Sequence, residues 1–192
     1  MAEPARGKAT YQDVLDAPPQ LVAEILDGDL YTQPRPAGPH TEAASVLGMD
    51  IGSAFHRGRG GPGGWLILDE PELHLGPDVL VPDIAGWRRE RMSEVPARPY
   101  IGVAPDWVCE VLSPRTALVD RRLKMRIYAR EQVQHIWLVE PLARTLEVYR
   151  LDGEGYRATT TFGESEIARI EPFDAIELDL SALWPNPRPT KE

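Results

Sequence analysis

Residues 105–140 read PDWVCEVLSPRTALVDRRLKMRIYAREQVQHIWLVE, and this stretch decides the fold. Its first segment, PDWVCEVL, is the most apolar strand candidate in the chain, which is typical of a strand buried on both faces. The segment SPRTALVDRRLKMRIYARE predicts a helix that starts at Ser113 and Pro114 or several residues later, and HIWLVEP predicts a second strand. The apolar stripe of the helix is expected at Val119, Leu123 and Ile127. A strand, a helix and a strand in this order predict a right-handed crossover between two parallel strands.

The residues before this unit predict further strands and helices. TYQDVLDAPP predicts a short helix, and LVAEILDGDLYTQ predicts a strand pair around its Asp-Gly turn. WLILDE and VLVPDIAGW predict two more strands. Residues 41–56 predict an amphipathic helix, because apolar residues recur there at helical spacing. Its expected buried stripe comprises Ala44, Leu47, Ile51, Ala54 and Phe55.

The residues after the unit predict a β-rich tail. TLEVYRL and YRATTTF flank a D-G-E-G turn and predict an antiparallel hairpin, and IELDLSALW closes the fold. The predicted fold class is therefore α/β in the α+β sense, with helices flanking a mixed β-sheet. A chain of 192 residues suits one domain with a full core, so we expect a single domain over 1–192. The ends, about 1–8 and 185–192, are expected to be flexible.

Net charge, cysteine content and the length of the apolar runs argue against several classes of protein. The net charge of −9 argues against a protein that coats DNA, because phosphate contacts need Lys and Arg. It remains compatible with a metal site, since a bound cation reverses the local field. The one cysteine, Cys109, lies in an apolar run and is expected to be a packed thiol. Without an apolar run of about 18 residues or a signal peptide, we expect no membrane span and a cytoplasmic location.

Two carboxylates stand inside apolar segments, where a carboxylate is costly. Asp83 interrupts VLVPDIAGW, and Glu110 interrupts WVCEVL. A carboxylate in such a place needs a partner or a metal. The separation of 27 residues (110 − 83) is enough for two neighbouring strands, and two acids so placed suit Mg²⁺. The alternative is that each acid pairs with an arginine or caps the backbone.

Lys124 is the candidate cation beside these acids. It lies four residues after Asp120 on the predicted helix, next to the apolar stripe. One interpretation is an exposed Asp120–Lys124 pair, which contributes only a few tenths of a kcal/mol, about 0.2–0.5. The other is a cation that reaches over the sheet towards a metal-bound water or a scissile phosphate.

These segments carry a family resemblance. VPDIAGWR and the run from PDWVCEVLSP to LEVYRL resemble the Uma2 family of proposed restriction endonucleases, formerly a domain of unknown function. AEILDGDL followed by PRPAGPH resembles the N-terminal pattern of that family, so the resemblance covers about residues 10–151. It implies a restriction-endonuclease-like PD-(D/E)XK core, in which acids on two strands bind a divalent metal. Asp83 matches the first acid and Glu110 the second, and the Val111 carbonyl would be a further ligand.

The resemblance also implies roles for other positions. The lysine of the general motif is absent, because Leu112 stands two residues after Glu110. The resemblance implies that the following helix supplies it, here as Lys124. Glu24 matches an N-terminal glutamate that would add an acid to the site. For His40, a site role and a role in helix entry or packing stay open. Ser113 and Asp120 match as a turn or cap residue and as a partner that orients Lys124.

The functional hypothesis is phosphodiester hydrolysis of DNA with Mg²⁺ or Mn²⁺, by Asp83, Glu110 and Lys124. One alternative is a nucleic-acid-binding or protein-binding module without catalysis on a nuclease scaffold. Another is a hydrolase of a different phosphoester, such as RNA. A homodimer is compatible with the first hypothesis, because cutting both strands of a duplex requires two sites.

Overall fold

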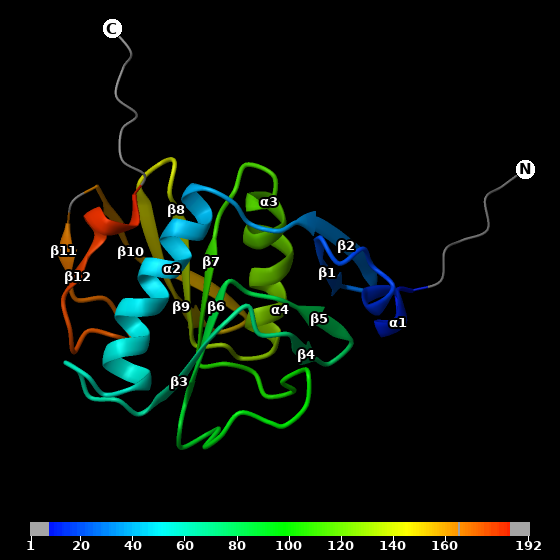
Figure 1. Ribbon diagram of the computed structural model, residues 1–192, viewed down its shortest axis with the longest axis horizontal. Coiled ribbons are helices and arrows are strands. Elements are labelled where there is room, and N and C mark those ends of the chain that lie inside the picture. Colours follow the sequence, from blue (N-terminus) through cyan, green and yellow to red (C-terminus); the bar gives the residue numbers. More distant parts are fainter. Residues whose placement is uncertain (1–7, 165, 185–192) are drawn as a thin grey trace, which may run out of the picture.

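The computed structural model describes residues 8–164 and 166–184. The ends that we expected to be flexible, 1–8 and 185–192, lie outside these ranges apart from Lys8. Within the described ranges, none of the helices has the length and apolar character needed to cross a membrane. The predicted class is confirmed: the fold is mixed α and β, with helices packed on a mixed sheet (Figure 1).

The main sheet has six strands in the order β10-β9-β8-β7-β6-β3. Its strands are β3 (Trp65–Asp69), β6 (Ile84–Arg88), β7 (Trp107–Val111), β8 (His135–Glu140), β9 (Thr145–Asp152) and β10 (Gly155–Gly163). β7 and β8 pair in parallel, as the strand, helix and strand of 105–140 predict, and all the other pairings are antiparallel. β7 is buried over its whole length, which explains its uninterrupted apolar sequence.

A second, four-stranded sheet lies beside the first, in the order β2-β1-β5-β4. It contains β1 (Leu21–Leu26), β2 (Asp29–Pro34), β4 (Leu73–Leu75) and β5 (Asp78–Leu80). The predicted hairpin of β1 and β2 is confirmed. Asp27 and Gly28 both adopt positive φ, 55° and 92°, which is the conformation that a two-residue turn needs to match the twist of its strands.

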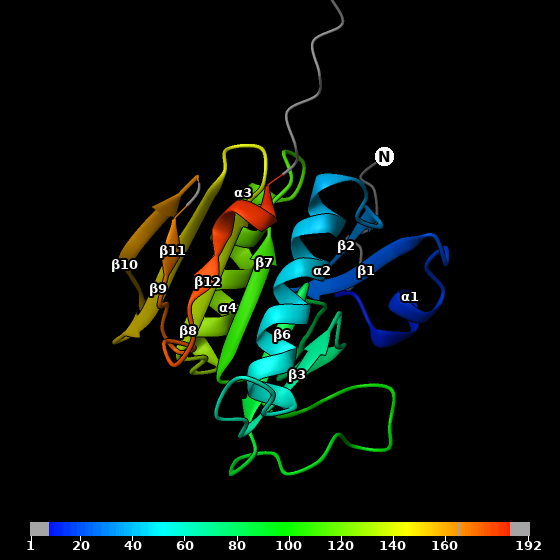
Figure 2. The same ribbon diagram turned by 60° about the vertical axis from the view of Figure 1, so that its left-hand side comes forward.

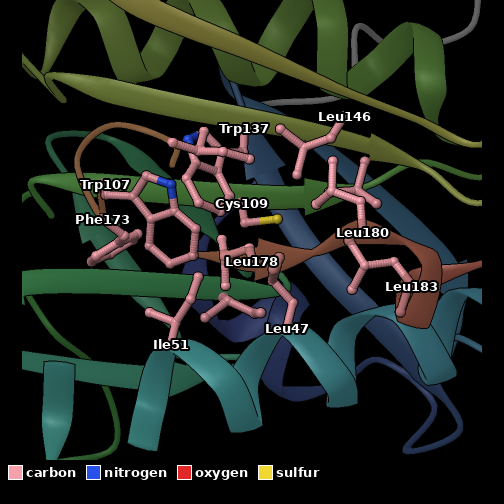
Figure 3. Close-up of a cluster of buried hydrophobic side chains, with 14 of the residues drawn as sticks. Leu47, Ile51, Trp107, Cys109, Trp137, Leu146, Phe173, Leu178, Leu180 and Leu183 are labelled. Atoms are coloured by element: carbon pink, nitrogen blue, oxygen red, sulfur yellow. The ribbon is translucent and has the colours of Figure 1, made fainter. Parts of the chain in front are cut away.

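Helical segments cover both faces of the six-stranded sheet (Figure 2). α2 (Pro39–Ile51) and the π-helical turn η1 (Gly52–His56) pack on one face. α3 (Ala117–Val119), the π-helical turn η2 (Asp120–Lys124) and α4 (Met125–Arg130) follow β7 and lie over the other face. Figure 3 shows Leu47 and Ile51 of α2 facing Trp107 and Cys109 on the first face. The Cys109 thiol is buried there, as expected.

The remaining elements come from the first and last parts of the described chain. α1 (Tyr11–Leu15) confirms the short N-terminal helix and lies beside β1. At the other end of the chain, a small two-stranded sheet and a 3₁₀ turn close the α2 face of the core. These last elements are β11 (Ile167–Ala168), β12 (Leu178–Asp179) and η3 (Leu180–Leu183).

Two boundaries differ from the sequence prediction, and a third decides between two alternatives. The segment 79–87 is not one strand: it leaves the small sheet at the end of β5 and joins the large sheet at β6, with Pro82 between them. Proline has no N–H to donate to a strand ladder, which favours a break there. The helix after β7 starts at Ala117, which agrees with the later of the two starts left open, and α2 begins at Pro39. In the stripe of α2, Ala43 is fully buried and Ala44 only half-buried.

Candidate active site

Asp83 and Glu110 meet where the chain passes between the two sheets. Ile84 of β6 pairs with Cys109 of antiparallel β7, so continuing this register by one residue sets Asp83 opposite Glu110. Asp83 lies in the break before β6 and not within a strand, which corrects the sequence prediction. Its carboxylate Oδ2 accepts a hydrogen bond of 2.7 Å from the Val111 N–H. This bond fixes the acid against the backbone of β7.

Glu110 is almost fully buried and points to the face that carries η2 and α4. Its neighbours along β7 alternate between the two faces, as strand geometry requires. The Tyr128 hydroxyl donates to Oε1 at 2.6 Å, and Lys124 Nζ lies 3.3 Å from Oε2. Both carboxylate oxygens therefore have a partner from the helical segment that follows β7.

Lys124 lies at the centre of a buried group of charges. Its side chain is only 2% exposed, and Nζ lies 2.9 Å from Glu24, 3.3 Å from Glu110 and 3.5 Å from Asp120. The interpretation as an exposed Asp120–Lys124 pair is wrong, because both side chains face the sheet. We call Lys124, Glu24, Glu110 and Asp120 the buried charge cluster. Lys124 is held by all three acids at once.

Glu24 reaches the cluster from β1, in the other sheet. Besides contacting Lys124, its Oε1 accepts a hydrogen bond of 2.8 Å from the Val81 N–H. Val81 stands two residues before Asp83, in the break between β5 and β6. Glu24 therefore ties the small sheet to the segment that carries Asp83.

The turn η2 places two members of the cluster. Asp120 and Lys124 are its first and last residues, and α4 continues from it with Tyr128 on the same face. A π-helical turn is a wider turn that proteins use mostly as a single insertion, often at functional sites. The buried stripe here includes Asp120, Lys124 and Tyr128, whereas Val119 and Leu123 from the predicted stripe are half-buried.

One ammonium group does not balance three buried carboxylates. Burial raises the pKa of Glu110 well above its usual range, although the positive charge of Lys124 acts to lower it. Burial likewise raises the pKa of Glu24 and of Asp120. Burial acts to lower the pKa of Lys124, but the charges of Glu110 and Glu24 outweigh it and hold that pKa well above its ordinary value. Lys124 is thus charged, and the cluster keeps a surplus of acidic groups.

His40 and Ser113 lie close to Asp83 and Glu110 and line the same cavity. His40, in the first turn of α2, has Nε2 3.4 Å from Asp83 Oδ1. Burial acts to lower the pKa of His40, but the hydrogen bond and charge of Asp83 outweigh it and raise that pKa. Of the two interpretations left open for His40, this contact favours a site role. Ser113 shares hydrogen bonds with Thr116 and so forms the turn before α3, as its sequence suggested.

A cavity of about 410 Å³ connects these groups with the surface. Its lining comes from the end of β2, the start of α2, the break before β6 and the segment after β7. Among the lining residues are most of the predicted site residues, namely His40, Asp83, Glu110, Val111, Ser113, Asp120 and Lys124. Glu24 lies behind Lys124 and contacts the site through it. The tertiary structure thus gathers the residues that the sequence analysis selected.

The comparisons with known proteins concern the family and the fold of the chain. A family model named Uma2, described as "Putative restriction endonuclease", matches residues 9–181. The chain belongs to the Uma2 family. No curated protein matches it. A solved structure from Anabaena variabilis ATCC 29413, described as a "putative nuclease belonging to DUF820", is similar with a TM-score of 0.73. The similarity covers 92% of this chain and 97% of that chain at 23% identity, which shows a shared fold.

Two features of this Uma2 site were not found from the sequence. Tyr128 was missed although it lies four residues after Lys124, and that spacing on a helix was the available signal. Arg35 and Arg115 line the same cavity from the segments that follow β2 and β7. Neither had a local signal, because both stand in proline-containing segments without periodicity, where a sequence does not reveal which side chains face each other.

The donor set of this Uma2 chain suits a hard divalent cation. The candidate ligands are the carboxylates of Asp83 and Glu110 and the carbonyl of Val111, all of them oxygen donors. Nowhere in 8–164 or 166–184 do three or more His, Cys, Asp or Glu side chains form a complete metal-holding group. A site with two carboxylates still fits Mg²⁺, which keeps several waters and is completed by substrate phosphates. The surplus of acidic groups in the buried charge cluster fits the same ion.

Proposed function

We propose that this Uma2 protein is a divalent-metal-dependent hydrolase of phosphodiester bonds, with DNA as its substrate and endonucleolytic cleavage as its reaction. The observation that carries the proposal is the opposition of Asp83 and Glu110 at one end of neighbouring strands, beside a buried lysine. All three line one cavity that opens to the surface. Two acids and a cation in this arrangement are what hydrolysis of a phosphate ester needs.

The carboxylates of Asp83 and Glu110 and the carbonyl of Val111 would hold Mg²⁺ or Mn²⁺. When bound, the ion supplies polarisation of a phosphoryl oxygen and a lower pKa for a coordinated water. The residues of the chain orient these ligands. Val111 N–H and His40 hold Asp83, whereas Lys124 and Tyr128 hold Glu110. We propose that Lys124 also stabilises the negative charge that grows on the attacked phosphate.

The test combines cleavage and metal binding. D83N and E110Q keep the size of each side chain and remove its charge. We expect both variants to lose more than about 100-fold in cleavage rate on plasmid DNA, in line with the loss of charge stabilisation at a reacting centre. Calorimetry with Mg²⁺ and Mn²⁺ should show binding to the parent and none to D83N. Cleavage by D83N at the parent rate would overturn the assignment.

A second candidate, a binding module without catalysis, is favoured by one contact pattern. Both oxygens of Glu110 already have protein partners, Lys124 and Tyr128, so an ion would have to displace one of them. Thermal unfolding separates the two functions, because a ligand that binds the folded state raises its stability. A melting temperature that rises with Mg²⁺ in the parent and not in D83N supports the hydrolase. A substrate panel that includes RNA separates DNA cleavage from action on another phosphoester.

Two further properties stay predictions. If the protein cuts both strands of a duplex, we propose that it acts as a homodimer, because each strand needs a site. Light scattering of the protein with and without duplex DNA tests this. The expected cytoplasmic location follows from the sequence alone and is tested by fractionation of cells that express the chain.

A further inference from the structure

The cavity that contains Asp83 and Glu110 has two cations at its edge that the catalytic proposal does not use. Lys124 is the innermost cation, and its ammonium group is surrounded by three carboxylates. Its positive charge is therefore largely balanced before any substrate arrives. A phosphodiester chain brings one negative charge for each phosphate into a site that already has a surplus of acids. Other cations are needed to hold the phosphates on either side.

Arg115 is one such cation. It lines the cavity from the segment after β7, and its side chain is exposed. No ion pair or hydrogen bond of its guanidinium is found among the residues that the structure describes. Its backbone is nevertheless well fixed, because Ser113 and Thr116 bond to each other on either side of it and Ala117 N–H donates to the Ser113 carbonyl. Arg115 thus offers a free guanidinium on an ordered turn.

Arg35 is the second cation, on the wall formed by the end of β2. It stands between Pro34 and Pro36, whose rings restrict the backbone on both sides. Its Nη1 lies 3.2 Å from Oε2 of Glu70, with the two side chains 58% and 42% exposed. An exposed ion pair of this kind is weak, because water and salt screen it. A backbone phosphate can accept two parallel hydrogen bonds from a guanidinium, whereas Glu70 accepts only one from Arg35.

Glu70 is held in position by the site itself. Its N–H donates a hydrogen bond of 3.0 Å to the Asp83 carbonyl, and it lines the cavity together with Arg35. Its φ of 44° lies in the left-handed region, which is uncommon for a residue other than glycine. Such conformations persist where the surrounding structure imposes them, often at functional sites. The backbone of Glu70 is therefore fixed beside Asp83, and its exposed carboxylate contacts Arg35 from there.

We propose that Arg35 and Arg115 form an arginine clamp that binds backbone phosphates of the substrate on both sides of the scissile bond, and that Glu70 occupies Arg35 until a phosphate replaces it. The clamp rests on the proposed function, since it assumes a nucleic-acid substrate. It assigns two positioning residues and one competing carboxylate to that substrate. The shared chemistry is the phosphodiester backbone, which single-stranded DNA, duplex DNA and RNA all offer.

The experiment measures binding apart from cleavage. All proteins carry D83N, which retains an oxygen to accept the Val111 N–H, and are mixed with fluorescein-labelled single-stranded DNA, duplex DNA or RNA without added metal, because D83N is expected to bind no Mg²⁺. We expect R35A and R115A each to weaken binding about tenfold and to reduce the slope of log affinity against log salt by about 1. R35K should restore part of the affinity. E70Q should tighten binding severalfold, because it frees Arg35. The probe that shows these effects most strongly identifies the substrate class.

A matched pair controls for net charge. Arg157 and Asp152 form an exposed ion pair of 3.4 Å on the β9–β10 hairpin, at the far side of the main sheet from β6. R157A and D152N change the charge as R35A and E70Q do, and should leave binding unchanged. Equal binding by all variants, equal effects of both pairs, or no binding of any probe would overturn the clamp. An unchanged affinity for E70Q would overturn the competing role of Glu70.

The outcome for the clamp is separable from that for catalysis. If the chain with Asp83 intact cleaves DNA in an Asp83-dependent way while R35A and R115A bind normally, the clamp is wrong and the hydrolase stands. If binding depends on both arginines while the chain cleaves no substrate, the clamp is supported and hydrolysis is overturned.

Discussion

The buried charge cluster lies at the inner end of the cavity, and the Arg35–Glu70 pair lies at its outer end. Both contain ion pairs of a cation with a carboxylate, but the inner pairs are buried and the outer pair is exposed. Lys124 Nζ and Glu24 are 2.9 Å apart with side chains 2% and 3% exposed. Arg35 and Glu70 are 3.2 Å apart with side chains 58% and 42% exposed. The distances are nearly equal, so separation alone does not distinguish the two pairs. Their access to water does.

Burial decides which of these contacts can exchange. An ion removed from water cannot lose its partner without a large cost, so the inner charges must stay together and hold the site in shape. The outer charges remain solvated, and losing one contact costs little. We infer that the inner end is built to keep its geometry and that the outer end is suited to exchange one anion for another.

The largest expected effect comes from removing the inner cation. K124M keeps a long side chain and leaves Glu24, Glu110 and Asp120 without their shared partner. We expect a loss of about 3–5 kcal/mol in the free energy of unfolding, the usual cost of breaking a buried ion pair. Urea unfolding measures it, with R157M as an exposed control. A K124M protein as stable as R157M would show that the cluster is not the rigid end of the cavity.

Removing one hydrogen bond from the cluster should have a smaller effect. Y128F leaves Glu110 Oε1 without the donor that now lies 2.6 Å away, and we expect a loss of about 1–3 kcal/mol. Y11F is the matched control, because the Tyr11 hydroxyl donates at 2.8 Å to Glu72 in a part-buried place near the surface. Thermal and urea unfolding compare the two. Equal losses would mean that burial does not set the cost of these hydrogen bonds.

Lowering the pH tests a pair of intermediate burial. Arg121 binds Glu147 through two hydrogen bonds of 2.6 and 2.7 Å and so lowers the pKa of that carboxyl. The pKa of a glutamate in the unfolded chain is about 4.3, and the pKa of Glu147 in the folded protein is lower. The pair therefore stabilises the fold above about pH 4.3. This contribution is lost as the pH falls through the folded pKa. Solvent screening keeps it below about 1 kcal/mol.

The measurement is urea unfolding of the parent and of E147Q from neutral to acid pH. The difference in stability between them should shrink as the pH falls. E177Q is the control for removal of a carboxylate, because it takes one from a more exposed pair, in which Arg169 and Glu177 are 3.5 Å apart. A difference between the parent and E147Q that does not change with pH would contradict the role of this pair.

The smallest effect is expected at the outer pair. R35M should change the free energy of unfolding by less than about 1 kcal/mol, because exposed ion pairs contribute little. Differential scanning calorimetry in low and high salt measures this change. A loss as large as that of K124M would show that Arg35 has a structural role and would remove the contrast between the two ends of the cavity.

The local pattern of the sequence predicted much of the fold. The apolar segments around Glu110 and 135–141 predicted neighbouring strands, and the helical spacing between them predicted a connecting helix. The Asp-Gly pair predicted the hairpin of β1 and β2. Pro82 is the local signal that 79–87 is interrupted, because proline cannot donate to a strand ladder. These features depend on residues near each other in the chain, where periodicity and turn chemistry act directly.

The amino-acid sequence by itself determined that Asp83 and Glu110 are acids in apolar surroundings and made Lys124 the candidate cation, and the family resemblance added Glu24. Only the tertiary structure decided that one ammonium meets three carboxylates from β1, β7 and η2. It also decided that Tyr128 joins them, and that Arg35 and Arg115 face one cavity. The physical reason is that periodicity shows which side of an element is buried, whereas the partner on that side comes from a distant segment and depends on how the sheets and helices pack.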